Sequence, residues 1–144
     1  VIAKDVVSTS MKWASETSNL IDGIFTTTDA TEAKTDFAGQ ENTELMLTVD
    51  TSGAGYSCAN YTFPNGTKGY LPALGEWNIA YQNKSAINAA MTLIGGTALG
   101  SNSYWSSTQY SANYAWSLHW DNGTTGINSK NYNNYVRAFS ALTL

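Results

Sequence analysis

The chain has 144 residues, a length that fits one domain with a sizeable buried core. Charged residues make up 12% of it and aromatic residues another 12%, which excludes an intrinsically disordered segment, because such segments are poor in aromatic residues. The net charge of −4, with seven Lys and Arg residues spread along the chain, argues against a nucleic-acid partner, which requires a concentrated basic surface. Since no apolar run approaches the ~18 residues of a membrane span, we expect one domain over residues 1–144 that does not insert into a membrane.

The first half of the chain combines turn signals with short helical signals. Asp22-Gly23 predicts a turn, and the Thr-rich stretch 24–28 is β-prone. A helix is predicted to start near residue 42, with Asn42 or Thr43 as its N-cap. A further helical turn is predicted over residues 56–61, after two glycines interrupt the pattern.

Cys58 is the only cysteine, so no disulfide can form within the chain. Residues 55–61 contain no histidine or basic residue that could activate its thiolate. We therefore expect Cys58 to be a small, buried core residue.

The clearest helical pattern begins after Pro72 and ends at Gly95-Gly96. Its apolar residues recur at helical spacing: Leu74, Trp77, Ile79, Ala80, Tyr81, Ile87, Ala90, Met91 and Ile94. This stretch and the helix near residue 42 are the two helices that the sequence predicts.

From Ser101 onward the pattern changes to that of β-strands. The residues predicted to face the core are Trp116, Leu118 and Trp120. The residues predicted to face solvent between them are Ser117, His119 and Asp121. Asn122-Gly123 predicts a hairpin, and residues 136–142 a closing strand. The fold class is therefore α+β, with a mixed or antiparallel sheet. The predicted core comprises Trp77, Trp105, Trp116, Leu118, Trp120, Val136 and Phe139.

Candidates for catalysis are few. His119 is the only histidine, so a histidine-based metal cluster or a Ser-His-Asp arrangement would depend on it alone. Asp121 follows on the same strand face, within about 7 Å, which would allow an acid–base pair. The favoured interpretation is an exposed polar pair on a binding face. The carboxylates show no calcium-loop spacing, so we expect no bound metal. Because the candidates for catalysis are so few, we also expect no enzymatic activity and no cofactor.

Several motifs together resemble one known family. They are Gly69-Tyr-Leu-Pro-Ala-Leu-Gly-Glu-Trp77, Tyr104-Trp-Ser-Ser-Thr108, Tyr114-Ala-Trp116, Tyr135-Val-Arg137 and the earlier Asp36-Phe-Ala-Gly-Gln-Glu-Asn-Thr43. The chain resembles, over about residues 22–142, the C-type-lectin-like variable proteins that retroelements diversify, in the branch common among gut Bacteroides and their phages. The resemblance implies a C-type-lectin-like fold with a variable ligand-binding segment at about residues 104–140.

The resemblance also implies a codon test. Retroelements of this kind mutate template adenines, so an Asn codon ending in C can come to encode Ser, Tyr, Asp, His, Ile, Thr or Gly. It cannot come to encode Trp, Lys, Gln, Glu or Met. From Tyr114 to Asn133 the residues outside the accessible set are Trp116, Trp120 and Lys130. The mixture at the other positions is what partial substitution of an Asn-rich template would leave.

Two features differ from relatives of the same fold. Trp120-Asp-Asn122 has a different order from the Trp-Asn-Asp calcium element of sugar-binding C-type lectins, so calcium-dependent sugar binding is not expected. The formylglycine-generating relatives use catalytic cysteines, and the single Cys58 lies outside the C-terminal segment. Neither activity is therefore predicted.

The resemblance implies a non-enzymatic ligand- or receptor-binding domain, displayed on a phage virion or a bacterial cell surface and acting in adhesion. Its partner would be a protein or glycan receptor on a cell surface, and the sequence leaves homo-oligomers open. The predicted variable, ligand-binding positions are Tyr114, Ser117, His119, Asp121, Thr124, Ile127, Ser129, Tyr132 and Asn133. The alternative is an undiversified adhesive or structural module of a bacterial surface lipoprotein or pilus.

Overall fold

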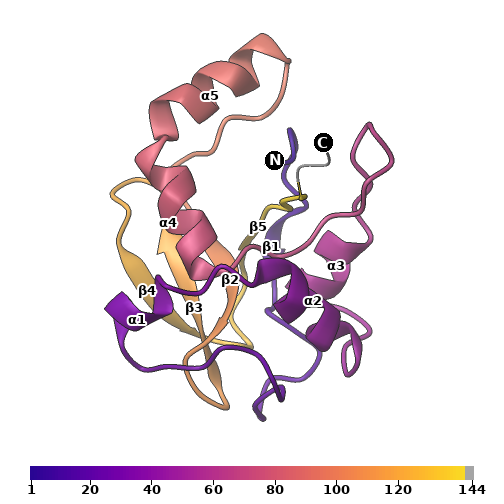
Figure 1. Cartoon of the computed structure of the whole chain (residues 1–144), viewed down its shortest axis with the longest axis vertical. Helices are drawn as coiled ribbons and strands as arrows, with labels where there is room; N and C mark the ends of the chain where they lie inside the picture. The colour runs from indigo at the N-terminus through magenta and orange to yellow at the C-terminus, as the bar shows by residue number, and fades with distance from the viewer. Residues whose placement is uncertain (142–144) are drawn as a thin grey trace.

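The computed structural model describes residues 1–141, which form a mixed sheet accompanied by helices (Figure 1). The strands are β1 (Ser8–Met11), β2 (Ser103–Gln109), β3 (Tyr114–His119), β4 (Thr125–Ser129) and β5 (Asn134–Val136). The helices are α1 (Ala30–Ala33), α2 (Gly39–Leu47), α3 (Ala54–Ala59), α4 (Leu74–Gln82) and α5 (Lys84–Leu93). The predicted α+β class is confirmed, although the described residues contain five helical segments instead of two.

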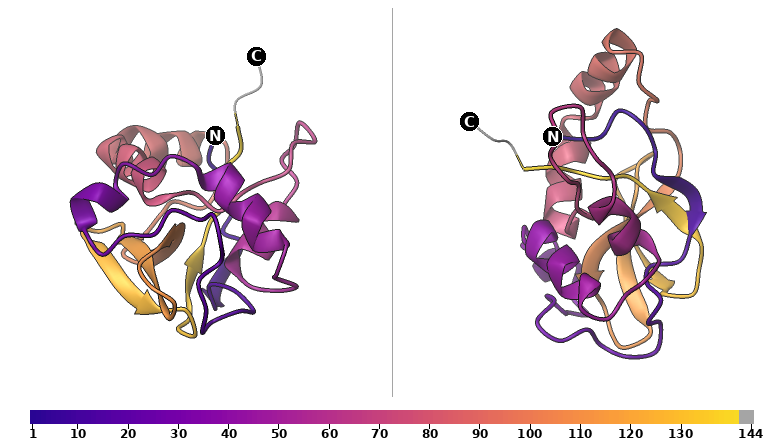
Figure 2. Two further views of the ribbon diagram at one scale, coloured as in Figure 1. Left: turned by 60° about the horizontal axis from the view of Figure 1, so that its bottom comes forward. Right: turned by 90° about the vertical axis from the view of Figure 1, so that its right-hand side faces the viewer.

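The strand order in the sheet is β1-β5-β2-β3-β4. Neighbouring strands are antiparallel except β2 and β5, which pair in parallel at Tyr104 and Tyr135. The predicted hairpin at Asn122-Gly123 is confirmed: it joins β3 to β4, and Gly123 has a φ of 72°, which favours glycine. Figure 2 (left) shows the helices gathered on one side of the strands, and Figure 1 shows α5 extending away from the sheet.

The predicted cap of the first long helix is wrong. Helix α2 already begins at Gly39, after Ala38. The side chain of Asn42 is buried, and its Nδ2 donates to Asp36 Oδ2 at 2.9 Å and to Ser107 Oγ at 3.1 Å. Asn42 therefore joins the helix to β2 instead of capping it, which local sequence could not indicate.

The second predicted helix is interrupted at Asn83, which separates α4 from α5. Asn83 has φ −109° and ψ 23°, and its Nδ2 donates to Ile79 O at 2.9 Å. A short polar side chain that bonds to nearby backbone competes with helix continuation.

The closing strand predicted over residues 136–142 is shorter than expected. It is limited to β5, which is followed by bridges from Phe139 to Ile2 and Tyr70. Leu142 lies outside the described residues.

Strand β2 is buried on both faces, although its second half is polar. Ser106, Ser107, Thr108 and Gln109 are each 0% exposed. A buried polar group is costly unless it has a hydrogen-bond partner. Ser106 Oγ donates to Trp116 O at 2.7 Å, and Ser107 Oγ accepts from the Asn42 side chain. These bonds connect β2 to β3 and to α2.

The next two residues of β2 connect it to the loops. Thr108 Oγ1 donates to Asp36 Oδ2 at 2.8 Å and accepts from Leu74 N at 2.9 Å, so it binds the start of α4. Gln109 Oε1 accepts from Ile21 N, while Gln109 Nε2 donates to Ile21 O. Each polar side chain of this half-strand therefore holds a segment from elsewhere in the sequence.

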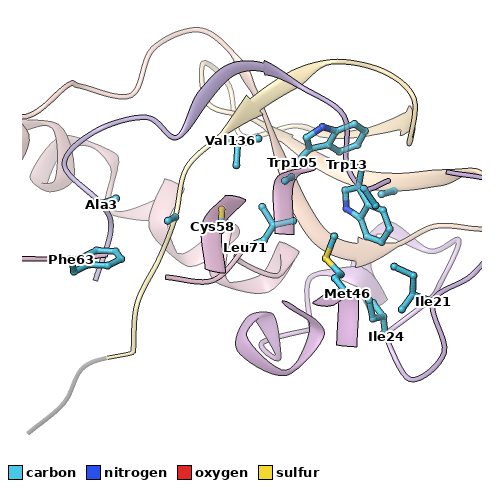
Figure 3. Close-up of a cluster of buried hydrophobic side chains, with 14 residues drawn as sticks. Ala3, Trp13, Ile21, Ile24, Met46, Cys58, Phe63, Leu71, Trp105 and Val136 are labelled. Carbon is cyan, nitrogen blue, oxygen red and sulfur yellow. The ribbon is translucent and has the colours of Figure 1, made fainter. Parts of the chain in front are cut away.

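The buried apolar residues form two clusters. The first includes Trp13, Met46 of α2 and Trp105 (Figure 3). The second includes Trp77 of α4, whose ring centroid lies 4.9 Å from that of Phe139. The predicted core residues are all buried: Trp77, Trp105, Trp116, Leu118, Trp120, Val136 and Phe139. Cys58 is buried as predicted, and burial raises the pKa of its thiol.

Replacing Thr108 with Val keeps its shape but removes both hydrogen bonds. The buried carboxylate of Asp36 then loses a donor and the Leu74 N–H loses its acceptor, so we expect the free energy of unfolding to fall by about 3 kcal/mol. Urea unfolding would measure this fall. The exposed Thr51→Val is the control and should change stability by less than about 0.5 kcal/mol. Equal effects of the two substitutions would contradict the role of Thr108.

Candidate functional site

The β3–β4 hairpin separates seven of the nine predicted binding residues into two groups, while Ser117 and Ile127 lie between them along the strands. Tyr114 and Ser129 are register partners, and Tyr132 N donates to Ser129 O at 2.8 Å, so these residues lie at one end. At the other end, His119 N donates to Thr124 O at 2.9 Å across the connecting turn. At about 3.3 Å per residue, the length of β3 separates the two ends by roughly 16 Å. We call them the strand-end group (Tyr114, Ser129, Tyr132 and Asn133) and the turn group (His119, Asp121 and Thr124).

Three large side chains of the predicted set are exposed. Tyr114 is 43% exposed, Ile127 46% and Tyr132 58%. The ring of Tyr110 lies 6.4 Å from that of Tyr114 and 5.3 Å from that of the buried Trp116, with edge-to-face geometry in both pairs. Tyr114 therefore packs edge-to-face on Tyr110, which in turn packs on the buried Trp116.

Ile127 is exposed because its strand, β4, lies at the edge of the sheet. Ile127 is the register partner of Trp116, so the two side chains share one face of the sheet. Trp116 is covered there, and its Nε1 donates to Thr27 O at 2.9 Å. Strand β4 is at the edge, where this cover ends, and Ile127 remains open to solvent.

The prediction that Ser117 faces solvent is wrong. Ser117 is 1% exposed, and its Oγ donates to Asn128 Oδ1 at 2.7 Å. Its register partner on β2 is Trp105, which packs in the first core cluster. Alternation assigned Ser117 correctly to the face opposite Trp116, but it could not reveal that this second face is also covered.

The turn group is only partly exposed and is held by the helices. Asp121 is exposed, whereas His119 is half-buried, with its Nδ1 enclosed and without a hydrogen-bond partner in the described residues. Lys84 Nζ donates to the carbonyl oxygens of Trp120 and Asp121, each at 3.1 Å. A Cβ atom at position 123 would lie 2.2 Å from the ring of Tyr81. A residue larger than Gly123 would therefore displace the turn.

Lys130 is the one lysine among residues 114–133, but it does not lie on the surface. It is 0% exposed, its Nζ donates to Asn19 O and to Gln109 Oε1 at 2.9 Å each, and it lies 4.5 Å from the ring centroid of Trp13. Burial lowers the pKa of Lys130 to about 8, while the nearby carboxylates of Glu16 and Asp50 act in the opposite direction. Only its position outside the accessible codon set could have indicated its structural role.

The exposed part of the predicted variable segment is almost uncharged. Between residues 104 and 140 the cations are Lys130 and Arg137, which is 1% exposed and donates from Nε to Ala3 O at 2.9 Å. The only carboxylate of this segment is that of Asp121. Contacts made by this surface must therefore be largely apolar and hydrogen-bonded.

Within residues 1–141, no three His, Cys, Asp or Glu side chains converge as a metal site. No helix in the described part of the chain has the length and apolar character needed to cross a membrane. Comparison with known protein families, curated proteins and solved structures found no match. Fold and geometry thus define a mixed α+β protein with a nearly uncharged, partly aromatic hairpin surface.

The buried ammonium of Lys130 should make stability depend on pH. Between pH 8 and 10 the folded lysine loses its proton, while the unfolded lysine, with a pKa near 10.5, keeps it. The unfolded state then binds more protons, so the free energy of unfolding should rise with pH in this window and be flat below it. Urea unfolding at several pH values should show this rise for the wild type relative to Lys130→Met. Parallel curves for the two proteins would contradict it.

Proposed function

We propose that this chain is a non-enzymatic ligand-binding domain of C-type-lectin-like fold. Its β3–β4 hairpin and the following loop would display a retroelement-diversified surface for attachment to a receptor on a host or neighbouring cell. It would act on a phage virion or a bacterial cell surface, without a cofactor.

The observation that carries the proposal is where the codon outliers lie. The three residues from 114 to 133 that an Asn codon ending in C cannot reach are all buried: Trp116 is 2% exposed, Trp120 0% and Lys130 0%. The exposed residues of the same stretch all belong to the accessible set: Tyr114, Asp121, Asn122, Thr124, Ile127, Asn131, Tyr132 and Asn133. This division supports a segment in which the buried tryptophans, whose codon contains no adenine, are kept and surface residues vary.

The chemistry of the exposed residues also supports binding. Tyr114 and Tyr132 offer large contact areas with few rotatable bonds, and the neighbouring Asn, Ser and Thr side chains offer adaptable hydrogen bonds. Antibody paratopes use the same mixture. Because exposed charge is nearly absent, we expect association without strong electrostatic steering and with weak dependence on salt.

Diversification can be tested in genomic DNA around the coding sequence. We expect a near-copy of the codons for about residues 104–140 beside a reverse-transcriptase gene. The two copies should differ at adenines of the template, changing codons such as those for Tyr114, Ile127 and Tyr132. Trp116 and Trp120 should be unchanged, because the Trp codon contains no adenine. A locus without such a copy would favour the undiversified adhesive module.

Binding can be tested on arrays of cell-surface glycans and proteins. The combined variant Tyr114→Ala, Ile127→Ala and Tyr132→Ala should lose more than about tenfold in affinity for whatever the wild type binds, because exposed aromatic residues supply most of such binding energy. Its stability should change little, since these side chains are exposed. Tyr56→Ala on α3, where the tyrosine is 39% exposed, is the matched control. Full retention of affinity by the combined variant would refute the assigned surface.

A further inference from the structure

A hollow of about 500 Å³ lies beside the hairpin surface, where three distant parts of the chain meet. Residues 10–17 form one wall, residues 52–53 a second, and Asn131 and Asn133 a third. It is an open depression instead of an enclosed cavity, so a bound molecule would stay partly exposed to solvent. Because most of its lining precedes residue 54, the hollow is distinct from the variable surface and shares only its last wall with it.

Backbone hydrogen bonds fix these walls relative to one another. Trp13 N donates to Lys130 O at 3.1 Å, which joins the first wall to the third. Ala54 N donates to the carbonyl oxygens of Lys12 and Trp13, at 3.0 and 2.9 Å, which joins the second wall to the first. Gly53 has a φ of 99°, and a Cβ there would lie 2.6 Å from Ala14 Cα. The walls of the hollow are therefore held in place before binding, so a ligand would lose little affinity to the conformational entropy of ordering them.

The lining presents free hydrogen-bonding groups. The hydroxyls of Ser10, Thr17 and Ser52 make no hydrogen bond within the described residues, nor do the side-chain amides of Asn131 and Asn133. Hydroxyl and amide groups both donate and accept, as do the hydroxyls of a sugar. Met11 and Ala14 add an apolar part of the lining, suited to the C–H face of a sugar ring.

Lys12 is the charged residue of the lining; the neighbouring Glu16 is not part of the lining, and its Oε1 accepts from Ser18 N and Asn19 N. Lys12 is exposed in the lining, and its ammonium forms no ion pair in the described part of the chain. No carboxylate contributes to the lining. The nearby Asp50 is 4% exposed and lies behind Ser15, whose N–H and Oγ donate to Asp50 Oδ1 at 3.1 and 2.9 Å.

We propose that this hollow binds an acidic saccharide, with the Lys12 ammonium on its carboxylate and the Ser, Thr and Asn side chains on its hydroxyls. A single exposed ammonium matches a single carboxylate, and the surrounding groups match a polyol. The site needs no metal ion, and only its third wall, Asn131 and Asn133, belongs to the segment proposed to vary.

Nuclear magnetic resonance titration of the ¹⁵N-labelled chain tests the proposal. The probes are methyl glycosides of a uronic acid and of a sialic acid, with methyl glucoside and acetate as the comparison. One acidic glycoside should give saturable shifts at the amides of Lys12, Ser52 and Asn133, at concentrations up to about 20 mM. Lys12→Gln should weaken this binding by about three- to fivefold, the effect of one exposed ion pair. Lys68→Gln, at an exposed lysine elsewhere, should not weaken it.

The outcomes separate this site from the hairpin surface. The variant Tyr114→Ala with Tyr132→Ala should keep saccharide binding even if it loses a receptor, because neither tyrosine lines the hollow. The absence of saturable shifts at these amides with both acidic glycosides would overturn the proposal. Equal shifts with acetate, which indicate an ion alone, would also overturn it, as would equal affinity for methyl glucoside or an unchanged affinity of Lys12→Gln.

Discussion

The fold depends on one constraint: strand β2 is buried on both faces, yet residues 106–109 are polar. Each of these side chains must find a partner, because an unpaired polar group inside a protein costs about 1–3 kcal/mol. The partners come from α2, the start of α4, β3 and the loop around Ile21. Polar burial here determines which segments meet, whereas apolar contacts alone would tolerate several arrangements.

Two tryptophans extend this network into the apolar core. Trp13 Nε1 donates to Ser106 O at 2.8 Å, and Trp77 Nε1 donates to Trp105 O at 3.0 Å. Both rings are fully buried and belong to different clusters. Trp13 also lies beneath the Lys130 ammonium, so the N-terminal segment supports the loop that carries Tyr132. The hairpin surface and the neighbouring hollow thus rest on the same buried base, which the proposed variation of exposed residues would leave intact.

Sequence patterns located much of the fold because they report local physics. The hairpin at Asn122-Gly123 follows from backbone preferences, and the inward side of β3 follows from alternation at Trp116 and Leu118. The predictions of the α2 cap and of an exposed Ser117 were wrong for the same reason. In each case a side chain reaches a partner that is distant in sequence or adjacent only in the sheet, such as Ser107 for Asn42. Trp13 was overlooked because its surroundings show no periodic pattern.

By itself, the sequence determined the α+β class and the identity of most core aromatic residues, and it is the basis for proposing residues 104–140 as a variable segment. The class and the core residues follow from the order of residue types along the chain, which hydrophobic periodicity records. Tertiary structure alone decided that seven of the nine predicted binding residues form two groups at opposite ends of a hairpin, and that Ser117 and Lys130 are buried. It also assembled the hollow beside them from residues far apart in sequence. The reason is physical: burial and proximity are set by which faces are covered, and cover comes from segments that no local pattern identifies.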